Sequence, residues 1–131
     1  MTINDALALH AALQACSASY TVIHDWKPVS VMPSFSGPAR LTLARMQHQL
    51  KAEVDAFTTA TQQVVKELGG PWKVDQQASP ECVTARQRIS ELGAQESTVN
   101  LDGFKLPEAD FLSDNCRLPP AVIEVLLPFI S

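Results

Sequence analysis

The residues most able to do chemistry are the histidines, and one of them stands directly beside an acid, as His24-Asp25. A carboxylate that orients an imidazole is half of a general-base site, so a small hydrolase or metal enzyme using His24, Asp25 or His48 is one hypothesis. Consecutive residues of a strand point to opposite faces, however, so we expect His24 and Asp25 not to pair directly. His48 has no acid three or four residues away on its predicted helix, and His10 has only amide side chains near it. The histidines therefore favour solvated or interfacial roles.

The acids that come in close pairs do not form a catalytic dyad either. Glu53 and Asp55 stand two residues apart, as do Glu108 and Asp110. On a helix this spacing splays two side chains apart rather than bringing them together. The only glycine pair closes a predicted helix instead of opening one, so it is no phosphate-binding loop. We expect no enzyme, and no catalytic, cofactor-binding or metal-binding residues.

The cysteines are three, Cys16, Cys82 and Cys116, with wide spacings. No CxxC or HxxxH pattern accompanies them, so neither a disulfide framework nor a zinc site is indicated. Buried, reduced thiols are the default expectation, and they suit a cytosolic compartment.

The composition describes one domain with an adequate core and a sparsely charged surface. The chain has 131 residues, of which 46% are hydrophobic and 18% charged, with a net charge of -4. Seven of the fourteen acids but only two of the ten bases follow Ile89. An acidic chain is poorly suited to binding phosphates, which argues against nucleic acid. The N-terminus lacks a basic leader, and no apolar run approaches the ~20 residues that cross a membrane, so we expect a cytoplasmic protein.

One long helix, from about residue 38 to residue 68, must organise the fold. Ser36 can cap it, Pro38 suits its first turn, and Gly69-Gly70-Pro71 closes it. At ~1.5 Å per residue it would span roughly 45 Å, longer than a compact domain of this size. Its apolar stripe recurs every three or four residues, at Leu43, Met46, Leu50, Val54, Phe57, Thr61, Val64 and Leu68. The opposite face is polar but carries few charges, so it is either solvated or a wet interface.

Three shorter helices are predicted around this one. Asn4 is the expected cap of the first, Ser79-Pro80 starts the second, and Gly93 would supply its left-handed stop. Residues 107–112 could add one helical turn or two. The predicted ranges are 5–16, 80–92 and 119–127.

Two segments are predicted to be extended. Residues 20–35 contain Pro28 and Pro33, which exclude a continuous helix, and are expected to form a short edge strand or an extended arm. This arm carries Trp26 and could either wrap its own core or dock onto a partner. Residues 97–106 alternate in hydrophobicity around Asp102-Gly103, which predicts a β-hairpin there. The fold class is therefore mainly α: a single domain, 1–131, built on one long helix (about 38–68), with three shorter helices and a small β-hairpin.

The order of these elements resembles an uncharacterised family of small proteins encoded by tailed bacteriophages. The resemblance rests on the opening Ile3-Asn4-Asp5-Ala6-Leu7, on Lys66-Glu67-Leu68-Gly69 at the end of the long helix, on Val99-Asn100-Leu101, and on the apolar helix 122–130. It covers most of the chain and is a matter of pattern and order. The segment 20–35 departs from it, since the family runs helix into helix more directly. The family implies no catalytic residues.

The functional hypothesis is a non-enzymatic phage or prophage protein, an adaptor or inhibitor that binds a host or phage protein in the host cytoplasm. The alternatives are a structural or tail-assembly component of a virion, which would be a homo-oligomer, and the small hydrolase or metal enzyme above. No nucleic acid and no membrane are expected as partners. The residues predicted to bind the protein partner are Trp26, Gln47, Lys51, Gln62, Gln63 and Phe129.

Overall fold

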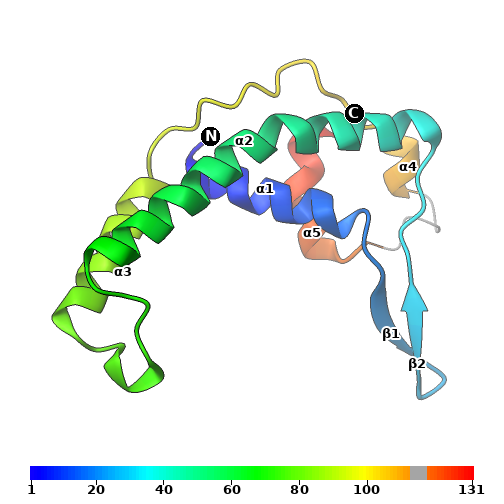
Figure 1. The fold of residues 1–131 in the computed structure, drawn as a ribbon. Coiled ribbons are helices and arrows are strands. Elements are labelled where there is room, and N and C mark those ends of the chain that lie inside the picture. Colours follow the sequence, from blue (N-terminus) through cyan, green and yellow to red (C-terminus); the bar gives the residue numbers. More distant parts are fainter. Residues whose placement is uncertain (113–117) are drawn as a thin grey trace.

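The computed structural model describes residues 1–112 and 118–131, and it is mainly α-helical with one two-stranded antiparallel ribbon (Figure 1). The predicted fold class is confirmed. The helices are α1 (Ile3–Ala15), α2 (Gly37–Glu67), α3 (Pro80–Gly93), α4 (Glu108–Leu112) and α5 (Pro120–Leu126), the strands are β1 (Tyr20–His24) and β2 (Lys27–Val31), and two short 3₁₀ turns are η1 (Val74–Gln76) and η2 (Leu127–Phe129).

The long helix α2 is continuous, as predicted. The Ser36 hydroxyl accepts a hydrogen bond from the Ala39 N–H, and Pro38 stands in the first turn. After the helix, Gly69 takes the left-handed conformation with φ of 91°, which a residue without Cβ adopts at little cost. The predicted cap and stop of α2 are both confirmed.

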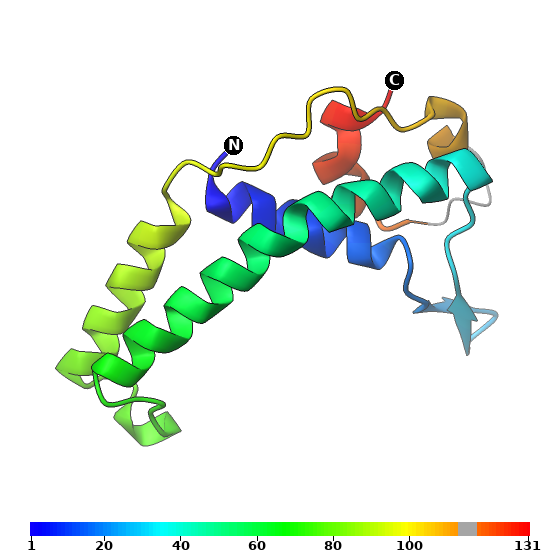
Figure 2. The same cartoon turned by 45° about the horizontal axis from the view of Figure 1, so that its top comes forward.

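The body of the protein forms around the first half of α2. Helix α1 packs across this half, and α5 packs against α1 (Figure 2). The side chains of α2 that are buried all belong to this half, at Ala39, Leu43, Met46 and Leu50. They share one core with Leu9 and Leu13 of α1 and with buried residues of α4 and α5.

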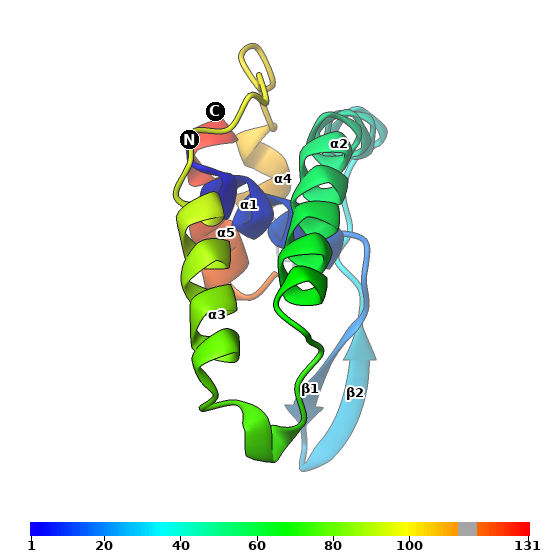
Figure 3. The ribbon, with the colours of Figure 1, turned by 60° about the vertical axis from the view of Figure 1, so that its left-hand side comes forward.

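The second half of α2 leaves the body and is accompanied by α3 (Figure 3). We call this pair, residues 54–93, the helical arm. In it the predicted apolar stripe of α2 continues, but Val54, Phe57 and Val64 are only partly buried. The period of the stripe is confirmed, and its burial differs between the two halves of α2, because one helix covers less surface than the whole body.

Two predicted helix boundaries are wrong. The cap of α1 is Thr2 and not Asn4: its hydroxyl accepts from the Asp5 N–H, and the Asp5 carboxylate accepts from the Thr2 N–H. Gly93 is not a left-handed stop but lies inside α3, where an added Cβ would stand 2.3 Å from Asn4 Oδ1. Glycine at this position allows the end of α3 to approach the start of α1.

The β-hairpin lies at 20–31 and not at the predicted 97–106. Its strands pair from Tyr20 with Val31 to His24 with Lys27, and the turn Asp25-Trp26 has positive φ at both residues, 49° and 63°. Positive φ at both turn residues is the geometry of a type I′ hairpin turn, in which Asp is common and Trp is not.

The Asp102-Gly103 signal does produce a turn, since the Phe104 N–H bonds the Leu101 carbonyl at 3.3 Å. The segment after it pairs with the C-terminus instead of with the segment before it. The Leu106 N–H bonds the Phe129 carbonyl at 2.7 Å, and the Ser131 N–H bonds the Leu106 carbonyl at 3.0 Å. A parallel contact with the chain end has therefore replaced the predicted local hairpin.

Candidate functional site

His24 and Asp25, the pair considered for catalysis, do contact each other, contrary to the expectation from strand geometry. His24 Nε2 lies 3.4 Å from Asp25 Oδ2. The reason is that Asp25 belongs to the turn, where its positive φ removes the alternation of a strand. Both side chains are largely exposed, 77% and 88%. A solvated pair of this kind interacts weakly and offers no water-excluded site.

The fold brings His10 and His48 to one hollow between α1 and α2, of about 500 Å³, together with Asp55. This grouping joins residues 38 positions apart, which no local spacing could have indicated. Among the residues that the structure describes, no group of three or more His, Cys, Asp or Glu side chains is placed to hold a metal ion. Gln47 and Lys51, two of the predicted partner-binding residues, line the same hollow.

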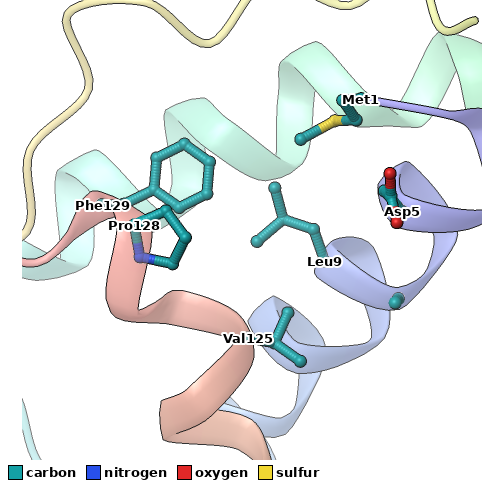
Figure 4. Close-up of a pocket in the computed structure, with 7 residues that line it drawn as sticks. Met1, Asp5, Leu9, Val125, Pro128 and Phe129 are labelled. Atoms are coloured by element: carbon teal, nitrogen blue, oxygen red, sulfur yellow. The ribbon is translucent and has the colours of Figure 1, made fainter.

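A second hollow, about 350 Å³, lies between the start of α1 and the C-terminal turn (Figure 4). Its walls are mainly apolar, with Leu9, Val125 and Phe129 among them. Its one acid, Asp5, is engaged in the helix cap, and the hydrogen bond from the Thr2 N–H holds the pKa of that carboxyl below its usual range. Phe129 is partly buried and packs against the core, so the fold already uses part of its surface.

The most exposed large apolar side chain of the described residues, Trp26, belongs to the hairpin, which projects from the body below the start of α2 (Figure 1). Every residue from 21 to 30 is exposed. The Trp26 side chain is 97% exposed and that of Ile23 is 70% exposed. Only the base of the ribbon is anchored in the body, where the Val31 side chain is 6% exposed. A surface that binds a partner needs exposed apolar side chains such as this tryptophan and isoleucine. A monomer that binds nothing has no need to expose them.

The predicted partner-binding residues do not form one surface. Trp26 is at the hairpin tip, Gln47 and Lys51 line the hollow beside α1, and Phe129 lies at the C-terminal turn. Gln62 and Gln63 are exposed on the helical arm. Ile23 is not among the residues predicted to bind a partner, although it alternates with its neighbours in the predicted extended segment.

The apolar residues of the hairpin divide between its two faces. Residues that pair directly across an antiparallel ribbon share a face. The register therefore puts Ile23 with Pro28 on one face. The other face carries Tyr20, Val22, Val29 and Val31, and a shallow hollow of about 420 Å³ lies over it. Val22 and Val29 are 37% and 41% exposed, so this face is not covered by the body.

Comparisons with protein-family models, with curated proteins and with solved structures find no match for this chain. In residues 1–112 and 118–131, no helix has both the length and the apolarity needed to span a bilayer.

Proposed function

We propose that this protein acts by binding another protein through the tip of its hairpin and catalyses no reaction. The observation that carries the proposal is the exposure of Trp26 and Ile23 on a hairpin that is anchored in the body only at its base. Tryptophan is among the residues most enriched at the energetic centres of protein interfaces, because its burial removes a large apolar area from water. An exposed Trp26 contributes no apolar burial to the stability of the monomer.

The kind of partner follows from charge and from the resemblance to phage proteins. A net charge of -4 disfavours nucleic acid as the target. The resemblance adds that the target is a host or phage protein in the host cytoplasm, with this chain as its adaptor or inhibitor. The tip itself carries His24, Asp25 and Lys27 around the tryptophan, which is a mixed polar rim around an apolar centre.

Photo-crosslinking tests the proposal at single-residue resolution. A benzophenone amino acid is placed at Trp26, and in a control protein at Arg88, which is exposed on α3. The proteins are expressed in cells of the native source and irradiated. We expect one discrete adduct with another protein from position 26 and none from position 88. Equal labelling from both positions, or none from either, contradicts the proposal.

Once the adduct is identified, its affinity separates the hairpin from the helical arm. Trp26→Ala is expected to weaken binding at least tenfold, about 1.4 kcal/mol, as loss of an interface anchor does. The double variant Gln62→Glu, Gln63→Glu is the comparison. If it alone weakens binding while the fold is kept, the interface lies on α2, which is one of the two roles that the sequence leaves open for its polar face.

A further inference from the structure

The two long edges of the hairpin are not equivalent. In an antiparallel ribbon closed by a two-residue turn, pairs bonded to each other alternate with pairs whose N–H and C=O groups face outward. The turn is Asp25-Trp26, so the pair next to it is bonded. The outward-facing pairs are then Ile23 with Pro28 and Thr21 with Ser30.

The outer edge of β2 is interrupted, and the outer edge of β1 is open. Pro28 has no N–H to offer at an outward-facing position, which is how natural sheets blunt an edge. On β1, by contrast, Thr21 and Ile23 keep both their N–H and C=O groups. Within the described residues, no hydrogen bond from outside the ribbon reaches the backbone of either residue. The outer edge of β1 can therefore accept another strand.

We infer that the occupant of this edge is β1 of a second copy of the chain, paired antiparallel about a twofold axis at Val22. In that register Thr21 of each copy faces Ile23 of the other, and both residues have outward-facing groups. The four resulting bonds need no shift of either ribbon. The inference rests on the proposed function only in taking the hairpin as a contact surface, since the dimer forms whether or not a target is present.

Charge and closure favour a second copy in this orientation. The charged residues Asp25 and Lys27 are at the tip, while the base next to β1 is the uncharged Ser17-Ala18-Ser19. Antiparallel pairing puts the charged tip of one copy beside the uncharged base of the other, whereas parallel pairing would oppose like charges. Because only one edge is open, the assembly closes as a dimer and cannot extend into a filament.

Pairing also supplies the sheet that the ribbon lacks. An isolated two-stranded hairpin is only marginally stable in water, and three or more strands with an apolar face are needed for independent stability. The dimer would form a four-stranded sheet with both copies of Tyr20, Val22, Val29 and Val31 on one face. The antiparallel arrangement holds the two bodies at opposite ends of this sheet.

Proline variants at matched outward-facing positions test which edge is used. Thr21→Pro removes an outward N–H from β1, and Ser30→Pro removes one from β2, and neither breaks a bond between β1 and β2. The residue pair is the same, so strain in the ribbon is matched. By sedimentation velocity over a concentration series, we expect the wild type and Ser30→Pro to be dimers and Thr21→Pro a monomer. A monomeric wild type, or a Thr21→Pro protein that dimerises like Ser30→Pro, overturns the inference.

Cysteine cross-linking gives a second readout, which also decides the case if Thr21→Pro does not fold. The axis puts Val22 opposite its own copy in a non-bonded pair, with Cα atoms about 4.5 Å apart, within disulfide range. Val22→Cys should form a disulfide-linked dimer under mild oxidation, and Val29→Cys, on the same face of β2, should not. Cys16 and Cys82 are buried, and Cys116 is replaced by serine in both proteins. Absence of the Val22→Cys dimer, or equal cross-linking of both variants, contradicts the register.

The outcomes also separate this inference from the proposed function. A monomer that still gives the position 26 adduct refutes the dimer and leaves target binding intact. If the cross-linked target pairs one of its own strands with the outer edge of β1, that edge has another occupant and the inference fails. A dimer whose position 26 gives no adduct with a different protein supports the inference and refutes the proposed function.

Discussion

The division of α2 between a body half and an arm half predicts that two truncations of one apolar stripe differ in cost. Leu50 has no exposed surface and is among the largest fully buried side chains. Phe57, two turns further along α2, is only partly buried and lies in the half of this helix that has no fully buried side chain. From the sequence alone, both are core truncations of roughly 2–5 kcal/mol. The structure predicts that Leu50→Ala costs more than Phe57→Ala, although the phenylalanine loses more atoms.

The magnitudes follow from burial. Leu50→Ala removes three carbon atoms, worth about 0.8 kcal/mol each in transfer free energy, and leaves a cavity in a fully buried site. We expect a loss of about 3–4 kcal/mol. A fully buried Phe→Ala change costs about 3–5 kcal/mol, and a partly exposed ring beside a single helix should cost about 1–2.5 kcal/mol. With an unfolding entropy of about 2.1 cal/mol/K per residue, a loss of 3 kcal/mol lowers Tm by about 11 °C in a chain of 131 residues.

Urea unfolding measured with two probes tests this reasoning. Trp72 is partly buried at the end of the helical arm, next to the space that Gly70 leaves against Val65. In a Trp26→Phe background its fluorescence reports the arm alone, while far-UV circular dichroism reports all helices. Exposed Gln63→Ala is the control and should stay within about 0.5 kcal/mol of the parent. A larger loss for Phe57→Ala than for Leu50→Ala would refute the division of α2 into a buried and a projecting half.

Two further predictions concern single polar groups. The Thr61 hydroxyl oxygen is buried in the helical arm without a hydrogen-bond partner, so Thr61→Val should raise the free energy of unfolding by roughly 1 kcal/mol, and a loss of stability in urea unfolding would show that the hydroxyl is satisfied. The pKa of Asp5 is lowered from 3.8, first by the hydrogen bond from the Thr2 N–H, so its contribution is present above about pH 3.8 and is lost as the pH falls through the lowered value. Asp5→Asn should therefore destabilise the protein at pH 6 and much less near pH 2, and an equal effect at both pH values would count against this role for the carboxylate.

The sequence was sufficient for α2 because several independent signals agreed there. Ser36, Pro38 and Gly69 marked the ends, and the apolar stripe had one helical period throughout. Local signals of this kind act within a few residues, so they can be recognised without knowledge of the fold. They could not show that the stripe is covered by the whole body on one side of about Leu50 and by α3 alone on the other.

The hairpin was misplaced because two segments offered competing local signals. Asp102-Gly103 is a favourable turn, yet Leu106 on its C-terminal side pairs with Ile130 near the far end of the chain instead of with the segment before the turn. Asp25-Trp26 is a poor turn by composition, and Pro28 weakened the case for a strand. The register resolves this, since Pro28 occupies an outward-facing position, where a proline removes no hydrogen bond between β1 and β2. Non-local pairing decided both outcomes.

The candidate site was predicted less well than the fold, for a physical reason. Exposed residues on a helix face can be listed from periodicity, but whether they share a surface depends on how the elements pack. Gln47 and Gln62 lie on the same helix, yet one lines a hollow against α1 and the other projects with the arm. Trp26 belongs to a segment that the sequence predicts either to wrap its own core or to dock onto a partner. The structure leaves it exposed, because the ribbon is anchored only at its base.

The anchoring of that base explains how an exposed tip can still be held in a defined direction. Between β2 and α2, Pro33 is fully buried and Phe35 packs against Phe111, with ring centroids 5.4 Å apart. The ribbon therefore leaves the body from a fixed point, immediately before the first turn of α2, while residues 21–30 contact little of the chain. A fixed base lowers the entropy that a partner must remove on binding, and a free tip leaves its apolar area available to that partner. Burial of the base and exposure of the tip are thus two parts of one arrangement, and it is this arrangement that favours binding through the hairpin over binding through the polar face of α2.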